Sequence, residues 1–305
     1  MSKAKNATFL FHRDFMEYHQ DRFDDFSLMV FKDDKLVGIL PANIQGHTVY
    51  SHQGLTYGGL LVEAKMKLND FIHCFSTILE YSHKSGFQGL YIKILPSIYN
   101  VLPNDELEYL MFVLNAQLER RDALSVVDMT HKTEISRDRK AGCKRAKKQG
   151  LEIREDNNFE LFWNKILIPN LELKHQAKPV HELNEIKLLC EKFPDNIRQF
   201  NVYKDDEIVA GTTIFETEQV AHSQYISGNQ DKNTLGSLDF LHYELINNVF
   251  NEKLYFDFGI SNEEQGKKIN KGLNYWKEGF GARTIMQSFY LVKTKNYGLL
   301  KDVMI

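Results

Sequence analysis

Cysteine is scarce in this sequence. The chain of 305 residues contains 3 cysteines, Cys74, Cys143 and Cys190, which lie far apart. Their spacing fits neither the disulfide framework of a small secreted domain nor the paired ligands of a zinc site. We therefore expect a protein of a reducing compartment and predict no metal site.

Long apolar runs are missing as well. No run approaches the roughly 20 residues that a membrane-spanning helix needs, and residues 1–15 lack the apolar core of a signal peptide. The formal net charge is only −3, so no overall field of one sign points to DNA or to a membrane. We expect a cytoplasmic protein without a transmembrane segment, which meets a membrane only peripherally, at its inner face.

Several catalytic signatures are also lacking. The sequence has no G-x-S-x-G, no H-E-x-x-H and no G-x-x-x-x-G-K-[ST] segment, which argues against a serine hydrolase, a zinc protease and a P-loop nucleotide-binding protein. With 43% hydrophobic and 26% charged residues, the chain has the profile of a globular protein. Its length suits one large or two ordinary domains.

The first half alternates predicted strands and helices, which is typical of an α/β domain. The expected order is helix 6–26, hairpin 28–40, strand 48–51, helix 68–86, strand 90–95, helix 107–118 and strand 123–129. Between the third strand and the long helix lies a glycine-rich loop, 51–59, with a polar character. Loops at strand ends carry function more often than other segments.

The second half repeats this order. The hairpin that begins at Val202 matches the one that begins at Val30, 172 residues earlier, with the same valine, lysine and paired aspartates. A strand over 219–226 and a helix over 238–249 follow, as in the first half. The repeat predicts two related domains, 1–130 and 131–305. The second begins with a basic segment in which Ser136 is placed to cap a helix that runs to Gly150.

The stretch from Leu254 to Ala282 organises the second domain. It starts with an apolar strand that carries Asp257 and ends at Gly259, and a polar loop follows. Apolar residues at helical spacing then predict a helix that carries Lys277 and ends near Gly279. A strand over 285–292 completes the unit.

Two segments of this stretch carry a resemblance to a known family. Asp257-Phe258-Gly259-Ile260-Ser261 and the later Trp276-Lys277-Glu278-Gly279-Phe280-Gly281-Ala282 resemble the C-terminal signature of the Fem-like branch of the GNAT acyltransferase superfamily. The whole chain is similar to the tandem-GNAT proteins of that branch found with bacterial capsule and O-antigen genes. The resemblance implies two tandem GNAT-like α/β domains, each a mixed twisted sheet flanked by helices. It also implies that residues 295–305 return to the first domain.

By the same resemblance the protein is expected to be an N-acyltransferase. The expected reaction moves an acyl group, acetyl first of all, from acyl-CoA to an amino group of a cell-envelope or polysaccharide precursor such as an amino sugar or nucleotide sugar. A Fem-type transferase that uses aminoacyl-tRNA on a peptidoglycan precursor is the alternative. The usual [QR]-x-x-G-x-[GA] segment for the CoA diphosphate is imitated only poorly by 230–236, which favours this alternative. An inactive sugar-nucleotide-binding module is the third hypothesis.

Three residues are predicted to be catalytic. Lys277 matches the lysine of the Fem-like segment, which implies that it neutralises charge on the acyl carbonyl; otherwise it is a solvated lysine beside Trp276. Asp257 ends a strand, where functional residues gather in α/β sheets, but it would serve equally as a turn acceptor. The resemblance implies that the segment from His175 to His181 faces the cleft, which makes His175 a candidate general base, since the ordinary pKa of histidine lies near neutrality. A surface connector is the competing interpretation.

The remaining candidates are predicted to bind substrate or phosphate. The predicted substrate contacts are His52, Gln53, Thr56 and Tyr57 in the first glycine-rich loop, with His181 and Tyr225 in the second domain. The basic helix is expected to hold phosphates of either substrate, including tRNA, through Arg137, Lys140, Lys144 and Arg145. A tight turn and a solvated helix face are the plainer alternatives.

Overall fold

The computed structural model describes residues 3–305, except for the side chains of residues 174 and 175. The chain forms two compact units, and each is described by itself. The first comprises the residues up to Asp122, with Glu264–Lys268 and Met286–Ile305, and the second comprises Ala123–Glu263 and Ile269–Ile285. Two strands, β8 (Gln117–Asp128) and β16 (Arg283–Lys293), run from one unit into the other.

The main sheet of the first unit has the order β1-β4-β5-β7-β16-β8. Its further strands are β1 (Asp24–Asp25), β4 (Asn43–Gln45), β5 (Thr48–Tyr50) and β7 (Gly89–Lys93). A small sheet has the order β2-β3-β6, made by β2 (Leu28–Lys32), β3 (Lys35–Leu40) and β6 (Leu61–Val62).

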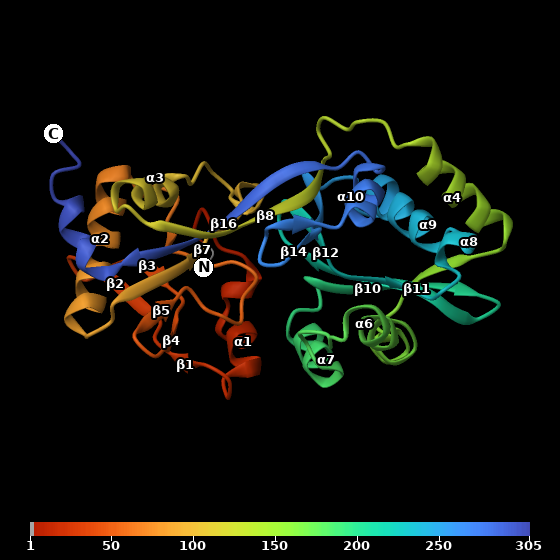
Figure 1. Cartoon of the computed structure of the whole chain (residues 1–305), viewed down its shortest axis with the longest axis horizontal. Coiled ribbons are helices and arrows are strands. Elements are labelled where there is room, and N and C mark those ends of the chain that lie inside the picture. Colours follow the sequence, from red (N-terminus) through yellow and green to blue (C-terminus); the bar gives the residue numbers. More distant parts are fainter. Residues whose placement is uncertain (1–2) are drawn as a thin grey trace. The chain divides into compact units, whose positions relative to one another are not determined.

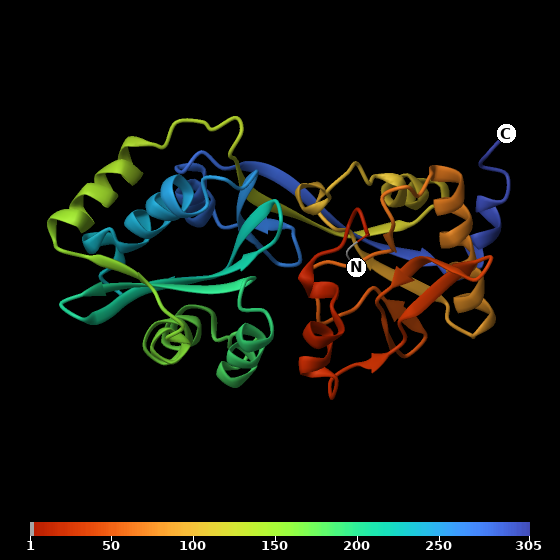
Figure 2. The same ribbon diagram turned by 180° about the vertical axis from the view of Figure 1, so that it is seen from behind.

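Two helices cover the core of the first unit. The long helix α2 (Leu68–Lys84) buries one apolar face, including Phe71, Phe75 and Leu79, and α3 (Glu106–Val113) adds Leu110. The final helical turns, Thr294–Leu300, lie beside α2, as both views show (Figures 1 and 2).

The sheet of the second unit has the order β8-β13-β12-β11-β10-β9. Its strands are β9 (Glu152–Glu155), β10 (Ile197–Lys204), β11 (Glu207–Glu216), β12 (Val220–Gly228) and β13 (Tyr255–Ile260). The short strands β14 (Asn262–Glu263) and β15 (Lys268–Ile269) follow β13 in the chain.

Helices cover both faces of this sheet (Figure 1). On one face lie α4 (Arg137–Lys148), α8 (Lys232–Leu235), α9 (Ser237–Glu244) and α10 (Lys271–Glu278). On the other face lie α5 (Phe159–Leu161), a π-helical segment (Phe162–Leu167), α6 (Ile168–His175) and α7 (Leu183–Lys192). A second π-helical segment, Leu245–Val249, extends α9. The side chain of Ser136 caps α4 by accepting from the Arg139 N–H, as predicted.

The repeat seen in the sequence has a structural counterpart. Both hairpins turn on two aspartates with positive φ, at 48° and 58° for Asp33 and Asp34 and at 50° and 62° for Asp205 and Asp206. Such a two-residue turn suits the right-handed twist of a hairpin. Each unit also contains a parallel strand pair, β5 with β7 and β12 with β13. The mixed α/β fold expected from the sequence is therefore confirmed.

Some expected elements differ from those observed. In place of one helix over 6–26, the chain forms short turns at Phe9–Phe11, Arg13–Met16 and Glu17–His19. The helix expected over 107–118 stops at Val113. There Asn115 takes a left-handed φ of 50°, which ends a helix.

The boundary between the units also differs from the one expected. It falls after Asp122 and not after residue 130, because the single strand β8 runs through both units. The returning C-terminal segment begins at Met286 rather than at residue 295.

Candidate active site

The candidate site lies where two parallel strands of the second unit diverge. β12 and β13 pair from Val220 with Tyr255 to His222 with Asp257. Beyond this point β12 continues to Gly228 and β13 to Ile260 without further pairing to each other among the described residues. An extra residue on β12, Gln224, shifts the register with β11 at this level. Such a bulge bends a strand away from its neighbour.

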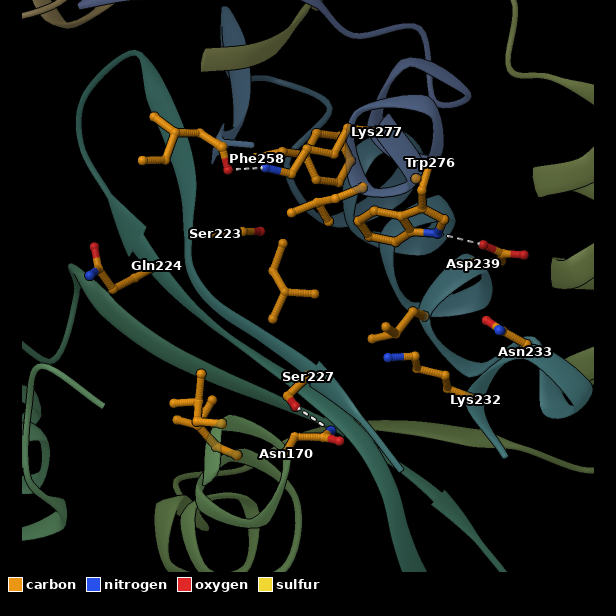
Figure 3. Close-up of a pocket in the computed structure, with 17 residues that line it drawn as sticks. Asn170, Ser223, Gln224, Ser227, Lys232, Asn233, Asp239, Phe258, Trp276 and Lys277 are labelled. Carbon is orange, nitrogen blue, oxygen red and sulfur yellow. Dashed lines mark hydrogen bonds between the residues drawn. The ribbon is translucent and has the colours of Figure 1, made fainter. Parts of the chain in front are cut away.

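A pocket of about 490 Å³ occupies the gap (Figure 3). Its walls come from both helical layers: Leu167 and Asn170 from one side of the sheet, Leu238 and Trp276 from the other. Side chains from opposite faces share one cavity only because the strands between them have separated. Eight of the lining residues are apolar: Leu167, Leu171, Ile226, Leu238, Phe258, Ile260, Leu273 and Trp276.

Lys277 lies in the wall of this pocket and is only 2% exposed. Its Nζ donates to the carbonyl oxygens of Gly259 at 3.0 Å and Ile260 at 2.6 Å, at the end of β13. Figure 3 draws one of these two hydrogen bonds. Burial lowers the pKa of Lys277 to about 8, an effect that the nearby Asp257 opposes. The helix α10 thus presents an amine that titrates close to neutral pH.

Asp257 is fully buried and is not part of the pocket lining. Its Oδ1 accepts the Gly259 N–H at 2.7 Å, and its Oδ2 lies 3.0 Å from Nδ1 of His222. Gly259 has a φ of +69°, a conformation that glycine adopts without steric cost. Asp257 therefore fixes the kink that orients the two carbonyls that hold Lys277.

A buried carboxylate lies at the start of α9. Asp239 lines the pocket, and its Oδ1 accepts from Arg139 of α4 at 2.6 Å and from Nε1 of Trp276 at 2.9 Å. Burial raises the pKa of Asp239, while Arg139 counteracts this effect. The helices α4 and α9 pack so closely that a Cβ on Gly142 would lie 1.9 Å from the Asp239 carboxylate. The first turn of α9, a natural anion site, thus holds an anion supplied by the protein.

The pocket also contains polar groups, some of which are hydrogen-bonded within the protein and one of which is not. Asn170 donates to the hydroxyl of Ser227 at 2.8 Å, and also to the Gly228 carbonyl. Ser223 is 4% exposed, and its buried hydroxyl has no hydrogen-bond partner within the described part of the chain. A buried polar group is normally satisfied, so Ser223 is available to a ligand.

The first glycine-rich loop, 51–59, lies in the first unit, where it is hydrogen-bonded to β7. Ser51 donates its N–H to Tyr91, and its hydroxyl accepts from the Lys93 N–H at 3.0 Å. The Gly58 N–H donates to the Lys93 carbonyl, and Nζ of Lys93 donates to the carbonyls of Gln53 and Leu55. Loop 51–59 thus bridges the ends of β5 and β7, where the corresponding strands of the second unit diverge.

The four predicted loop residues have internal contacts of their own. His52 is 4% exposed and stacks on His19. The Gln53 side chain bonds to Asn43 and Gln45, the Thr56 carbonyl accepts from Gln287, and the Tyr57 hydroxyl donates to Thr8.

Two predicted substrate contacts of the second unit meet each other outside the pocket lining. The Tyr225 hydroxyl accepts the backbone N–H of His181 at 3.0 Å and lies 2.7 Å from its Nδ1. Burial raises the pKa of Tyr225 to about 12, so the phenol stays protonated. His175 is the last residue of α6, and its side chain lies outside the part that the structure describes.

The predicted phosphate-binding residues lie on α4 and do not line the pocket. Lys140 pairs with Glu134 at 2.7 Å, and Arg145 donates to the carbonyl of Asn233, which is a pocket residue. Arg137 and Lys144 are exposed. Among the described residues, no group of three or more His, Cys, Asp or Glu side chains is placed to hold a metal ion, and no helix there has both the length and the apolar character to cross a bilayer.

Of the predicted site residues whose side chains the structure describes, Lys277 alone lines the pocket. The sequence analysis missed Asn170, Ser223, Lys232 and Asp239. A signal for Asp239 was available, since a charged residue interrupts the apolar run Leu238–Leu241 of a predicted core helix. No comparable signal marks Ser223, because strand divergence cannot be read from the sequence.

Comparison with known proteins agrees with this geometry. Residues 174–277 match the family model described as "Acetyltransferase (GNAT) domain". This segment includes β12, β13 and Lys277, so the match falls on the elements that line the pocket, and it supports a transferase activity. Among curated proteins, none matches the chain.

Three solved structures share the fold. FemX has a TM-score of 0.68 at 9% identity, over 97% of this chain and 95% of that one. The C-terminal domain of a putative lysylphosphatidylglycerol synthetase from Agrobacterium fabrum has a TM-score of 0.59 at 14% identity, over 92% and 88%. A tandem GNAT protein from the clavulanic acid biosynthesis pathway has a TM-score of 0.51 at 13% identity, over 88% and 82%. At these identities the likeness shows the fold alone.

Proposed function

We propose that the second unit is an N-acyltransferase whose acyl group is handed to an amine in the pocket between β12 and β13. The observation that carries this proposal is the position of Lys277 in the pocket wall, held by the two carbonyls at the end of β13. The GNAT match over 174–277 supports the same reaction class.

Lys277 supplies the charge that this reaction needs. When an amine attacks an acyl carbonyl, the carbonyl oxygen gains negative charge, which hydrogen-bond donors stabilise. A protonated Lys277 has three N–H groups, of which two are used by Gly259 and Ile260. The third remains for the oxygen of the acyl group. Such a preorganised donor contributes about 3 kcal/mol to the stabilisation of the transition state.

Two molecules are candidates for the acyl donor, acyl-CoA and aminoacyl-tRNA. The GNAT domain favours acyl-CoA. A CoA diphosphate, however, is an anion that a helix N-terminus would bind, and Asp239 already occupies the first turn of α9 beside Arg139. This observation favours the second candidate, an aminoacyl-tRNA. The exposed Arg137 and Lys144 on α4 are then available for the tRNA phosphates.

The acceptor that we propose is an amino sugar of a cell-envelope precursor, carried free or as a nucleotide sugar. The Ser223 hydroxyl and the Asn170–Ser227 pair give the pocket polar contacts for sugar hydroxyls. Trp276 and Phe258 provide apolar ring faces in the same pocket. The sequence of this chain resembles Fem-like proteins found with polysaccharide genes, and this resemblance suggests the same class of acceptor.

A matched donor panel tests the function. The full chain is incubated with acetyl-CoA, with S-acetyl-N-acetylcysteamine, which lacks the diphosphate, or with a mixture of aminoacyl-tRNAs. UDP-glucosamine and glucosamine are the acceptors, and products are measured by mass spectrometry. We expect an N-acyl product from at least one donor and a loss of about 100-fold in Lys277→Met.

The donors that give an N-acyl product show which of the two candidate acyl donors the protein uses. Product from acetyl-CoA alone supports the first, and product from aminoacyl-tRNA alone supports the second. No product from any donor, or full activity of Lys277→Met, would contradict the proposal. Binding of UDP-glucosamine without turnover would indicate the inactive binding module instead.

A further inference from the structure

The hydrogen bonds of Lys277 have a consequence for its neutral form. A neutral lysine amine has two N–H groups and one lone pair. The carbonyls of Gly259 and Ile260 accept both N–H groups. The lone pair is then left over, on a side chain that lines the pocket.

The titratable and charged groups around Lys277 come from three elements. From β13 the nearby Asp257 favours the charged form. From α9 come His242, which is fully buried, and Asp239, and from α8 comes Lys232, which lines the same pocket. Burial lowers the pKa of Lys277 to about 8. Near neutral pH, the fraction of molecules with a neutral Lys277 is therefore far larger than the fraction for an ordinary lysine.

We propose that Lys277 is a self-acylation site: an acyl thioester bound in the pocket transfers its acyl group to Nζ of Lys277 when no acceptor amine is present. This inference rests on the proposed function in one respect only, that the pocket admits an activated acyl group.

The reaction balances without another reagent. The Nζ lone pair attacks the thioester carbonyl carbon, and a C–N bond forms. The C–S bond then breaks, and the thiolate leaves and takes up the proton that Nζ loses. The products are an N-acyl lysine and a free thiol. The amide is uncharged, so the modified chain has lost its cationic donor and part of its pocket volume.

The first unit contains a matched internal control. Nζ of Lys93 also donates to two carbonyls, of Gln53 at 2.9 Å and Leu55 at 2.7 Å. Burial lowers the pKa of Lys93 to about 8 as well. Lys93 does not line the pocket of the second unit. If the lowered pKa alone made a lysine reactive, both lysines would be acylated. If reaction requires an acyl group bound in the pocket, only Lys277 is acylated.

The experiment uses the full chain and two thioesters, acetyl-CoA and S-acetyl-N-acetylcysteamine, without an acceptor. Intact mass spectrometry counts the acetyl groups, and peptide mapping locates them. With at least one thioester we expect a single acetyl group on Lys277, added about tenfold faster than on Lys93 or any exposed lysine. The rate should rise up to about pH 8 and then level off, following the pKa of Lys277.

The outcomes separate this proposal from the proposed function. Equal acetylation of Lys93 and Lys277, or slow acetylation spread over exposed lysines, overturns the self-acylation site. So does a Lys277→Arg chain that still gains one rapid acetyl group. If an acceptor is acylated while Lys277 stays free, the proposed function stands and this inference fails. If Lys277 is acetylated and no acceptor is, the inference stands and the proposed function fails.

Discussion

Nδ1 of His222 lies 3.0 Å from Oδ2 of Asp257 at the last paired position of β12 and β13. The pair joins the two strands at the point beyond which they diverge. Because Asp257 also accepts the Gly259 N–H, it connects the strand junction to the carbonyls that hold Lys277. These contacts favour a positioning role for Asp257 toward Lys277, and the catalytic role expected from the sequence stays a prediction.

This arrangement predicts different effects for two substitutions of Asp257. In Asp257→Ala the Gly259 N–H loses its buried acceptor, which costs about 1–3 kcal/mol of unfolding free energy. Asp257→Asn keeps an acceptor oxygen for that N–H, so most of this stability should remain. Acyl transfer should fall by about 100-fold in the alanine variant, because Lys277 is displaced, and by much less in the asparagine variant.

Thermal unfolding and the mass-spectrometric transfer assay measure the two effects. A directly catalytic carboxylate gives another pattern: Asp257→Asn would then be as stable as the native chain and as inactive as Asp257→Ala. That result would restore the role predicted from the sequence.

Gly259 offers a second test with a matched control. It has a φ of +69° and a Cβ there would lie 3.2 Å from Cε1 of His222, whereas Gly150 has a φ of +72° and nothing within 4 Å of its Cβ position. Both alanine substitutions incur the backbone cost of about 1–2 kcal/mol. Only Gly259→Ala should also reduce acyl transfer, because it shifts the carbonyls that hold Lys277. Equal activity of the two variants would show that these carbonyls do not position the lysine.

The sequence allowed the repeated order of elements to be predicted, because hydrophobic periodicity and turn residues are local signals. The two aspartate turns and the Ser136 cap are examples. The path of β8 and β16 through both units could not be predicted, since a strand does not encode which partners it meets. The helix was expected to reach Leu118 because the apolar spacing continues that far. It ends at Val113, since Asn115 adopts a left-handed conformation that does not continue a helix.

The site was predictable only where a motif marked it. Lys277 lies in the Fem-like segment and in the pocket wall. Loop 51–59 looked equally functional, since glycines and polar residues suit ligand contact as well as internal bonding. Its contacts with β7 give Ser51 and Gly58 a structural role, and these are long-range contacts that no local pattern reveals.

The lowered pKa of Lys277 predicts a dependence of stability on pH. A lysine with a folded-state pKa of about 8 and an ordinary pKa in the unfolded chain loses its proton earlier when folded. The contribution of Lys277 to the unfolding free energy should therefore rise as pH increases from about 8 to 10.5, by up to about 3 kcal/mol, and Lys93, whose pKa is also lowered to about 8, adds a rise of its own. Urea unfolding at several pH values should show this rise in the native chain and a smaller one in Lys277→Met. Parallel curves for the two chains would contradict it.

Two buried serines should respond in opposite ways to the loss of their hydroxyl. Ser51 is 1% exposed and its hydroxyl accepts the Lys93 N–H, while Ser223 is 4% exposed and its hydroxyl has no partner within the described part of the chain. Removing a satisfied buried acceptor costs about 1–3 kcal/mol, whereas removing an unsatisfied hydroxyl is neutral or stabilising. Ser51→Ala should thus lower the unfolding temperature and leave acyl transfer intact.

Ser223→Ala should show the reverse. Its unfolding temperature should hold or rise, and KM for the amino-sugar acceptor should increase about tenfold, the effect of about 1.4 kcal/mol from one lost hydrogen bond. Both substitutions remove one oxygen from a buried serine, so each variant is the control for the other in the measurements of unfolding temperature and KM. If Ser223→Ala loses stability and keeps its KM, the hydroxyl has a structural partner, and the acceptor binds elsewhere in the pocket.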